Sequence, residues 1–160
     1  MKLPKSARLH HRSLQERLFS EGSGFQEFPL KLRWHALTAE ELASNFRNRV
    51  PDLIGPVQVL VSVPKKFRRK AVDRVLLRRR IREAYRLNRP GLLAIVKEIP
   101  EIRTLSLGFI YVHKENASYA EIEARMKKIL SKLGDKLKEK YEKNIEGNQN
   151  GYNKNNDSAD

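Results

Sequence analysis

The segment 65–89 carries most of the positive charge of the chain. Its twelve Lys and Arg residues face only two acids, Asp73 and Glu83, so the segment holds +10 of the formal charge of +14. Charge of this density repels itself and destabilises any compact fold unless a polyanion neutralises it. Nucleic acid is the polyanion that this pattern predicts.

Helical periodicity gathers this charge on one side of the segment. At 100° per residue, the basic side chains share one arc of about 140°, here called the arginine face, which consists of Arg74, Arg78, Arg79, Arg82 and Arg86. The adjoining arc carries the residues expected to pack on a sheet, which are Leu77, Ile81, Ala84 and Tyr85. We expect the helix to begin with Asp73 as its N-cap and to end at Asn88, before Pro90-Gly91.

A purely solvated helix surface is the competing interpretation of the arginine face. Solvated faces usually mix charge signs and gain i,i+4 ion pairs, whereas only Glu83 interrupts the arginines here, where we expect it to pair with Arg79 or Arg80. Phosphate binding explains the excess better, because guanidinium groups bind phosphate oxygens bidentately. A DNA-reading helix would add Asn, Gln or Ser as base readers and is commonly presented by a dimer, so structured RNA is favoured over DNA.

Apolar periodicity and turn residues predict one small sheet with helices. The expected strands are 28–35, 57–63 and 105–113. The expected helices are 13–19, a short helix opened by the capping box 38–41, the basic helix 73–88, a weak helix at 91–99 and a last helix opened by the capping box 118–121. A turn is expected at 21–24. This order predicts an α+β or α/β sandwich, with helices covering one face of a three-stranded sheet. Residues 144–160, rich in Asn and Gly, are predicted to form a disordered tail.

The strand predicted at 28–35 has two different faces. Its apolar positions from Phe28 to Trp34 alternate with the basic residues Lys31, Arg33 and His35. Alternation of this kind predicts a half-buried strand whose open face is basic.

Composition excludes several classes of protein. The chain of 160 residues, 39% of them hydrophobic, can bury one modest core, and it has no Cys for disulfides, thiolate metal sites or nucleophiles. Its four His residues lack metal-ligand spacing. Neither a signal peptide nor a long apolar run is present, so we expect a soluble, cytoplasmic protein without a membrane partner. Carboxylates are not clustered, so no catalytic side chain and no metal ligand is assigned.

Three stretches of the chain together resemble the signature of the bacterial ribonuclease P protein component: Val61–Lys66, Ala71–Arg74 and Arg78–Arg86. The match is specific from Arg78 to Arg86 and looser over the first helix and the last strand and helix. Two departures accompany it. The family's central Arg-Asn-Arg triplet reads Arg74-Val75-Leu76 here, and Gln15 stands where the family usually carries a Phe in its first helix.

The resemblance implies an architecture for residues 1–143. It implies a two-layer α-β sandwich with a small central sheet and a left-handed βαβ crossover, like the second domain of a small-subunit ribosomal protein, against the usual right-handed rule. In this alignment residues 38–56 are an insertion between the first two predicted strands, and the tail 144–160 lies outside the domain.

The resemblance also implies a function. The family's protein is the small subunit of a ribonucleoprotein whose RNA is the ribozyme, an endoribonuclease that removes the 5′ leader of precursor tRNA. Carried over residue by residue, contacts to the catalytic RNA would be made by Lys65, Lys66, Arg74, Arg78, Arg79, Arg82 and Arg86. The single-stranded leader would lie in a cleft formed by Phe19, Lys31, Arg33 and His35, which fits the use of aromatic and basic side chains to hold single strands.

The remaining expectations concern partners and alternatives. The resemblance implies two partners, the catalytic RNA and precursor tRNA, with Mg²⁺ bound mainly by the RNA subunit and the protein monomeric outside the ribonucleoprotein. A structural or ribosomal RNA-binding protein without a role in cleavage is the first alternative, and it would need no leader cleft. An autonomous nuclease is disfavoured by the missing carboxylate constellation, and a DNA-binding regulator would require a dimer.

Overall fold

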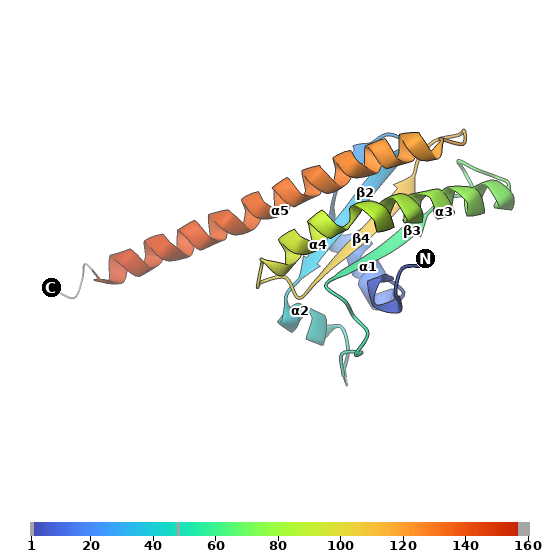
Figure 1. The fold of residues 1–160 in the computed structure, drawn as a ribbon. Helices are drawn as coiled ribbons and strands as arrows, with labels where there is room; N and C mark the ends of the chain where they lie inside the picture. Colours follow the sequence, from blue (N-terminus) through green and yellow to red (C-terminus); the bar gives the residue numbers. More distant parts are fainter. Residues whose placement is uncertain (1, 48, 157–160) are drawn as a thin grey trace.

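A four-stranded sheet forms the centre of the molecule, in the strand order β1-β2-β4-β3 (Figure 1). The strands are β1 (Ser23–Glu27), β2 (Leu30–Leu37), β3 (Val57–Ser62) and β4 (Thr104–Tyr111). Strand β2 pairs antiparallel with both β1 and β4, whereas β3 runs parallel to β4. The computed structural model describes the backbone of residues 2–47 and 49–156, and side chains up to residue 142.

Strand β1 stands where the sequence predicts a turn at 21–24, so that prediction is wrong. Residues from Ser23 onward pair with β2, from Ser23 opposite Trp34 to Glu27 opposite Leu30. A Cβ atom at Gly24 would lie 2.7 Å from the carbonyl oxygen of Leu32. The glycine therefore permits close approach of the two strands. The sequence alone does not distinguish a glycine with this role from a glycine in a turn.

Three helices cover one face of the sheet: α3 (Ala71–Asn88), α4 (Pro90–Lys97) and α5 (Tyr119–Asn156) (Figure 1). The predicted core stripe of α3 is confirmed, because Leu77, Ile81, Ala84 and Tyr85 are all fully buried. Ile122, Met126 and Ile129 of α5 are buried in the same cluster. Side chains of alternate strand residues, such as Leu107 and Phe109, complete this main core.

Helices α3 and α4 connect the parallel strands β3 and β4, which makes this unit the expected βαβ crossover. Both helices lie in front of the sheet in Figure 1, and β4 lies to the left of β3 when the two strands are turned to point upward. The crossover is therefore left-handed, and the predicted α+β sandwich is confirmed. It differs from the prediction in having four strands.

The opposite face of the sheet carries a smaller layer. Helix α1 (Arg12–Glu21) and the short helix α2 (Ala39–Ser44) pack there. They bury a second hydrophobic cluster formed by Leu9, Leu14, Leu18, Leu37, Leu42 and Ile54. The segment predicted as an insertion, 38–56, is therefore anchored to this layer through Leu42 and Ile54.

The helix ends test the capping predictions. Both predicted N-caps are confirmed, since the amide of Glu41 donates to Thr38 Oγ1 at 3.1 Å and that of Glu121 donates to Ser118 Oγ at 3.2 Å. The second capping box is complete, because the Ser118 amide also donates to the Glu121 carboxylate at 3.3 Å. The N-cap predicted at Asp73 is wrong: α3 begins at Ala71, and its N-cap, Lys70, makes no side-chain cap bond. The carboxylate of Asp73 is engaged instead by two donors from outside the helix, described below.

Residues 144–160, predicted as a disordered tail, lie outside the part of the chain whose side chains are described. Helix α5 has its backbone described to Asn156. The prediction of disorder stays a prediction.

Candidate nucleic-acid interface

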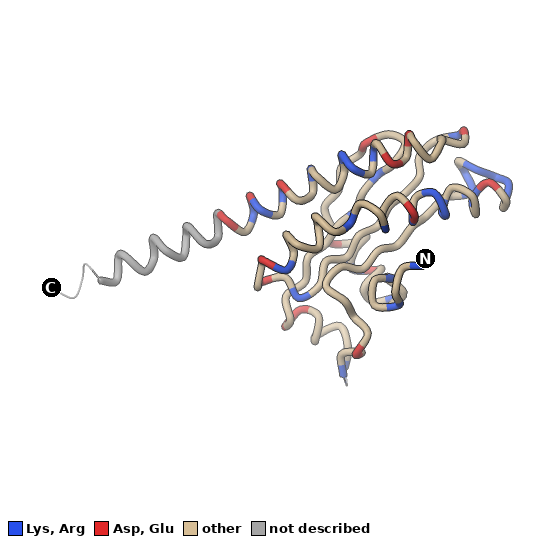
Figure 2. Tube along the Cα trace, viewed as in Figure 1, with Lys and Arg blue, Asp and Glu red and all other residues tan. Residues whose placement is uncertain are grey.

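The arginine face of α3 points away from the sheet, because the core stripe of the same helix is turned toward it. Figure 2 shows Lys and Arg along α3 and along the loop that precedes it. Within the described residues, no hydrogen bond or ion pair joins Arg78, Arg79 or Arg82 to another protein group. These three guanidinium groups are therefore available to an external anion.

The other two members of the arginine face already have partners. Arg74 donates from Nη1 to the carbonyl oxygens of Arg68 and Arg69, at 3.1 and 2.7 Å. Arg86 forms an ion pair with Glu83 at 2.6 Å. The predicted pairing of Glu83 with Arg79 or Arg80 is therefore wrong. Arg80 contacts Ala117 in place of Glu83, because its Nη1 donates to the Ala117 carbonyl at 2.6 Å.

The charge around Arg82 is crowded. Burial lowers the pKa of Arg82 from its ordinary value, and the nearby cations Arg78 and Arg8 lower it further. Guanidinium groups remain charged in proteins, so the shift reflects first the partial burial of Arg82 and second its repulsion by neighbouring cations. A phosphate group would relieve that repulsion.

Arg8 reaches this cluster through the N-terminal segment. It forms an isolated parallel bridge with Val59, and the amide of Leu9 donates to the Val59 carbonyl at 3.0 Å. The segment thereby lies along the outer edge of β3, facing α3. The sequence prediction missed Arg8 as a candidate contact, because no local pattern links it to a helix some seventy residues later.

A groove of about 580 Å³ opens between the N-terminal segment, the edge of β3 and α3. Its apolar lining includes Leu3, Leu9, Val59, Val61 and Val75. Its basic lining includes Lys2, Arg8, Arg78, Arg79, Arg82 and Arg86. Arg78, Arg79 and Arg82, the unpaired part of the arginine face, thus border a concave surface and not a flat one.

The loop between β3 and α3 displays Lys65 and Lys66, both exposed. A contact network fixes the far end of this loop, since Asp73 accepts from Arg68 Nη2 at 2.9 Å and from Asn116 Nδ2 at 3.1 Å. The hydrogen bond from Asn116, followed by the charge of Arg68, lowers the pKa of the Asp73 carboxyl. Arg68 also donates to the carbonyl of Lys114, so the loop is tied to the turn before α5.

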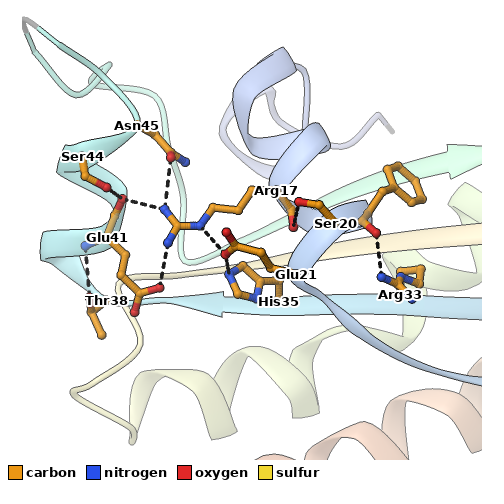
Figure 3. A network of polar contacts seen from close by, with 10 residues as sticks. Arg17, Ser20, Glu21, Arg33, His35, Thr38, Glu41, Ser44 and Asn45 are labelled. Atoms are coloured by element: carbon orange, nitrogen blue, oxygen red, sulfur yellow. Dashed lines mark hydrogen bonds and ion pairs between the residues drawn. The ribbon is translucent and has the colours of Figure 1, made fainter.

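Part of the predicted leader cleft comes together on the α1 side of the sheet. Phe19 of α1 is 44% exposed, and Arg33 of β2 donates from Nη2 to its carbonyl at 2.8 Å (Figure 3). Gly108 of β4, opposite Arg33, makes room here, because a Cβ there would lie 3.1 Å from Leu18 and 3.7 Å from the Phe19 ring. Lys31 is exposed on the same face of β2, one pleat further along.

His35 lies on that face of β2 but in a different environment. Figure 3 places it in the polar network between α1 and α2, and its Nε2 lies 3.6 Å from a carboxylate oxygen of Glu21. Burial, followed by the positive charge of Arg17, lowers its pKa. His35 therefore shares the face of β2 with Lys31 and Arg33 and lies beside Glu21 of α1, and its role in leader binding stays a prediction.

The described residues hold no group of three or more His, Cys, Asp or Glu side chains arranged to bind a metal ion. Nor does the described chain contain a helix with the length and apolar content needed to cross a membrane.

Comparison with known proteins agrees with the signature in the sequence. The family model described as Ribonuclease P matches residues 3–134. The ribonuclease P protein component of Porphyromonas gingivalis strain W83 is 31% identical over 131 residues, which cover 82% of this chain and 85% of that protein. The same component from strain ATCC 33277 is 33% identical with the same coverage.

Solved structures show the same fold. The RNase P protein of Staphylococcus aureus superposes with a TM-score of 0.56 at 16% identity, covering 81% of this chain and 96% of that one. The protein from Thermotoga maritima gives 0.53 at 19% identity, with 78% and 96% covered. The match over 3–134 and the relatives above 30% identity establish the family, so this chain belongs to the ribonuclease P proteins, the protein component of the endoribonuclease that matures tRNA 5′ ends.

Proposed function

We propose that this protein holds the catalytic RNA of ribonuclease P on the arginine face of α3 and the 5′ leader of precursor tRNA on the α1 side of the sheet. The observation that carries the proposal is the set of unpaired cations on α3: Arg78, Arg79 and Arg82 have no protein partner within the described residues. Three adjacent unpaired guanidinium groups destabilise an isolated protein through repulsion, and contact with RNA phosphates offsets that cost.

The seven residues expected to contact the catalytic RNA contribute to different degrees in this proposal. Arg78, Arg79 and Arg82 bind phosphates directly, and Lys65 and Lys66 extend the basic surface along the loop. Arg74 and Arg86 contribute less, because forming a phosphate contact would compete with the hydrogen bonds and ion pair that they already make.

The leader is held by Phe19, Arg33 and Lys31 in this proposal. An exposed aromatic ring beside cationic side chains can stack a base and bind its phosphate without reading the sequence. His35 lies on the same face of β2 but beside Glu21, so it contributes less to leader binding in this proposal.

The described part of the chain brings no three His, Cys, Asp or Glu side chains together to form a metal site of their own. In this proposal the Mg²⁺ of the holoenzyme is bound mainly by the RNA subunit. The protein would act by neutralising the repulsion between two RNA molecules and by positioning the leader.

Reconstitution tests this function directly. The purified protein is combined with its cognate ribonuclease P RNA, and cleavage of precursor tRNA is measured at low Mg²⁺, with RNA alone and protein alone as controls. We expect the protein to stimulate cleavage by the RNA and to cleave nothing by itself. Absence of stimulation would refute the proposal, while cleavage by protein alone would indicate an autonomous nuclease.

Leader dependence separates this function from that of a structural RNA-binding protein. Substrates with and without a 5′ leader are compared for binding to the reconstituted holoenzyme. The proposal requires the protein to strengthen binding of the leader-bearing substrate more than that of mature tRNA. Equal effects on both substrates would favour a structural role.

A further inference from the structure

We propose that the groove between the N-terminal segment, β3 and α3 takes up an unstacked nucleobase of the RNA subunit, with the neighbouring phosphates bound by the arginines at its rim. This inference rests on the proposed function, because it assumes that the anion bound by α3 is RNA. It goes further by assigning a base-binding pocket where a basic helix alone would bind only phosphates.

The chemistry of the lining specifies such an occupant. Val75, Leu3 and Val61 contribute apolar lining, while Arg8, Arg78 and Arg82 contribute positive charge to the same groove. A phosphate alone would gain nothing from the apolar part, and an uncharged ligand would leave the cation repulsion in place. A nucleotide combines a flat, largely apolar ring with an anionic group and matches both.

The backbone of β3 can contribute hydrogen bonds to a base. The Val59 carbonyl accepts from Leu9 at the outer edge of β3, so strand alternation turns the amide and carbonyl of Val61 toward that same edge. The Val61 side chain itself is buried in the main core and lines the groove. An adjacent donor and acceptor on the backbone can pair with the polar edge of a base without requiring one particular base.

Val75 is the residue that best distinguishes a base site from a phosphate site. It is 47% exposed although it is a large apolar side chain, and it lines the groove between the arginines. Val72, one turn earlier on α3, is 73% exposed and does not line the groove. Replacing either residue by Ala removes two methyl groups from the same helix, with the same change in helix propensity at both positions.

The main test compares Val75→Ala with the matched control Val72→Ala in binding to the cognate ribonuclease P RNA over a range of salt concentrations. We expect Val75→Ala to weaken binding about 3- to 10-fold, from the loss of apolar contact, with an unchanged salt slope, because no phosphate contact is lost. Val72→Ala should bind as the wild type does. Equal affinities for both variants, or a changed slope for Val75→Ala, would overturn the base pocket.

A second test locates the base independently of the RNA subunit. Amide signals of the labelled full-length protein are followed by NMR during titration with octauridylate and, separately, with inorganic polyphosphate. Octauridylate should shift the amide signals of Val59 and Val61, whereas polyphosphate should shift only signals of the arginine face. Identical shifts at Val61 with both probes would refute a base site. Stimulation of cleavage by the wild type would still uphold the proposed function.

Discussion

Arginines of one helix have very different environments, and this determines which of them can bind a ligand. Arg80 donates to the Ala117 carbonyl and joins α3 to the start of α5, while Arg86 pairs with Glu83. Arg78 and Arg82 are close enough to repel each other and have no carboxylate between them. Helical phase predicts which residues share a face, but partners from distant segments, such as Ala117, decide which cations stay unpaired.

Phe19→Ala tests the leader surface. We expect the reconstituted holoenzyme to bind leader-bearing precursor tRNA more weakly by about 1–3 kcal/mol, because a base loses its stacking partner. Binding of mature tRNA should not change. Phe28→Ala is the matched control, since Phe28 is also an exposed aromatic residue but lies between β1 and β2. A similar loss in both variants, or for both substrates, would exclude leader stacking by Phe19.

His35 should make the stability of the protein sensitive to acid. Burial and Arg17 hold its pKa in the folded protein below the ordinary value of 6.5. The unfolded chain therefore binds the proton more readily, so stability present above about pH 6.5 is lost as the pH falls toward the folded pKa. Urea unfolding of the wild type and His35→Gln at about pH 7 and pH 5 measures this loss.

The expected result is a smaller loss of stability on acidification in His35→Gln than in the wild type. The pKa of His11 is also lowered, mainly by burial, so some acid sensitivity remains in the variant. Equal losses in the two proteins would mean that His35 does not carry the effect.

At the scale of elements, the segment 38–56 is docked by a side-chain network. Arg17 of α1 donates from Nη1 to the Glu41 carbonyl at 3.2 Å and to Asn45 Oδ1 at 3.1 Å, and from Nη2 to the Glu41 carboxylate at 3.3 Å (Figure 3). Its Nε also pairs with Glu21 at 2.9 Å. The network fixes α2 against α1, and thereby the helix that carries Phe19.

Removal of this network should destabilise the fold. We expect Arg17→Ala to lower the free energy of unfolding by about 1–3 kcal/mol, because the half-buried acceptors lose a charged donor. Arg12→Ala is the control: Arg12 pairs with Glu16 on the same helix, but both side chains are highly exposed, so a loss below about 0.5 kcal/mol is expected. Urea unfolding that shows equal losses would indicate that α2 is held by its apolar contacts alone.

Local sequence patterns predicted most helices and strands. They failed where contacts between residues far apart in the sequence determine the structure. The two capping boxes and the core stripe of α3 were predictable, since they depend on residues three or four apart. Strand β1 was not predictable, because the sequence around Gly24 has no strand pattern of its own. Its extended conformation depends on pairing with β2. The start of α3 was also misplaced: Asp73 binds Arg68 and, far along the chain, Asn116, and does not cap the helix.

At the scale of the whole molecule, the two proposed RNA surfaces lie on different sides of the sheet. The helices α3, α4 and α5 form one layer, and α1 with α2 forms the other (Figure 1). The N-terminal segment links the two layers, because it pairs with β3 through Arg8 and continues into α1. The resemblance in sequence predicted both surfaces, but only the folded chain places Arg8 near Arg82 and His35 beside Glu21.

The central claim is that the unpaired arginines of α3 hold the catalytic RNA, and the salt dependence of binding tests it most directly. The triple variant Arg78→Gln, Arg79→Gln, Arg82→Gln is compared with a charge-matched triple variant in which the exposed residues Arg47, Arg49 and Lys97 become Gln. Affinity for the cognate ribonuclease P RNA is measured over a range of salt concentrations. The account predicts that the α3 variant binds more weakly and that its slope of log affinity against log salt is shallower by about 0.7–0.9 per lost phosphate contact. The control should keep the wild-type slope. An unchanged slope in the α3 variant, or equal changes in both, would contradict the account.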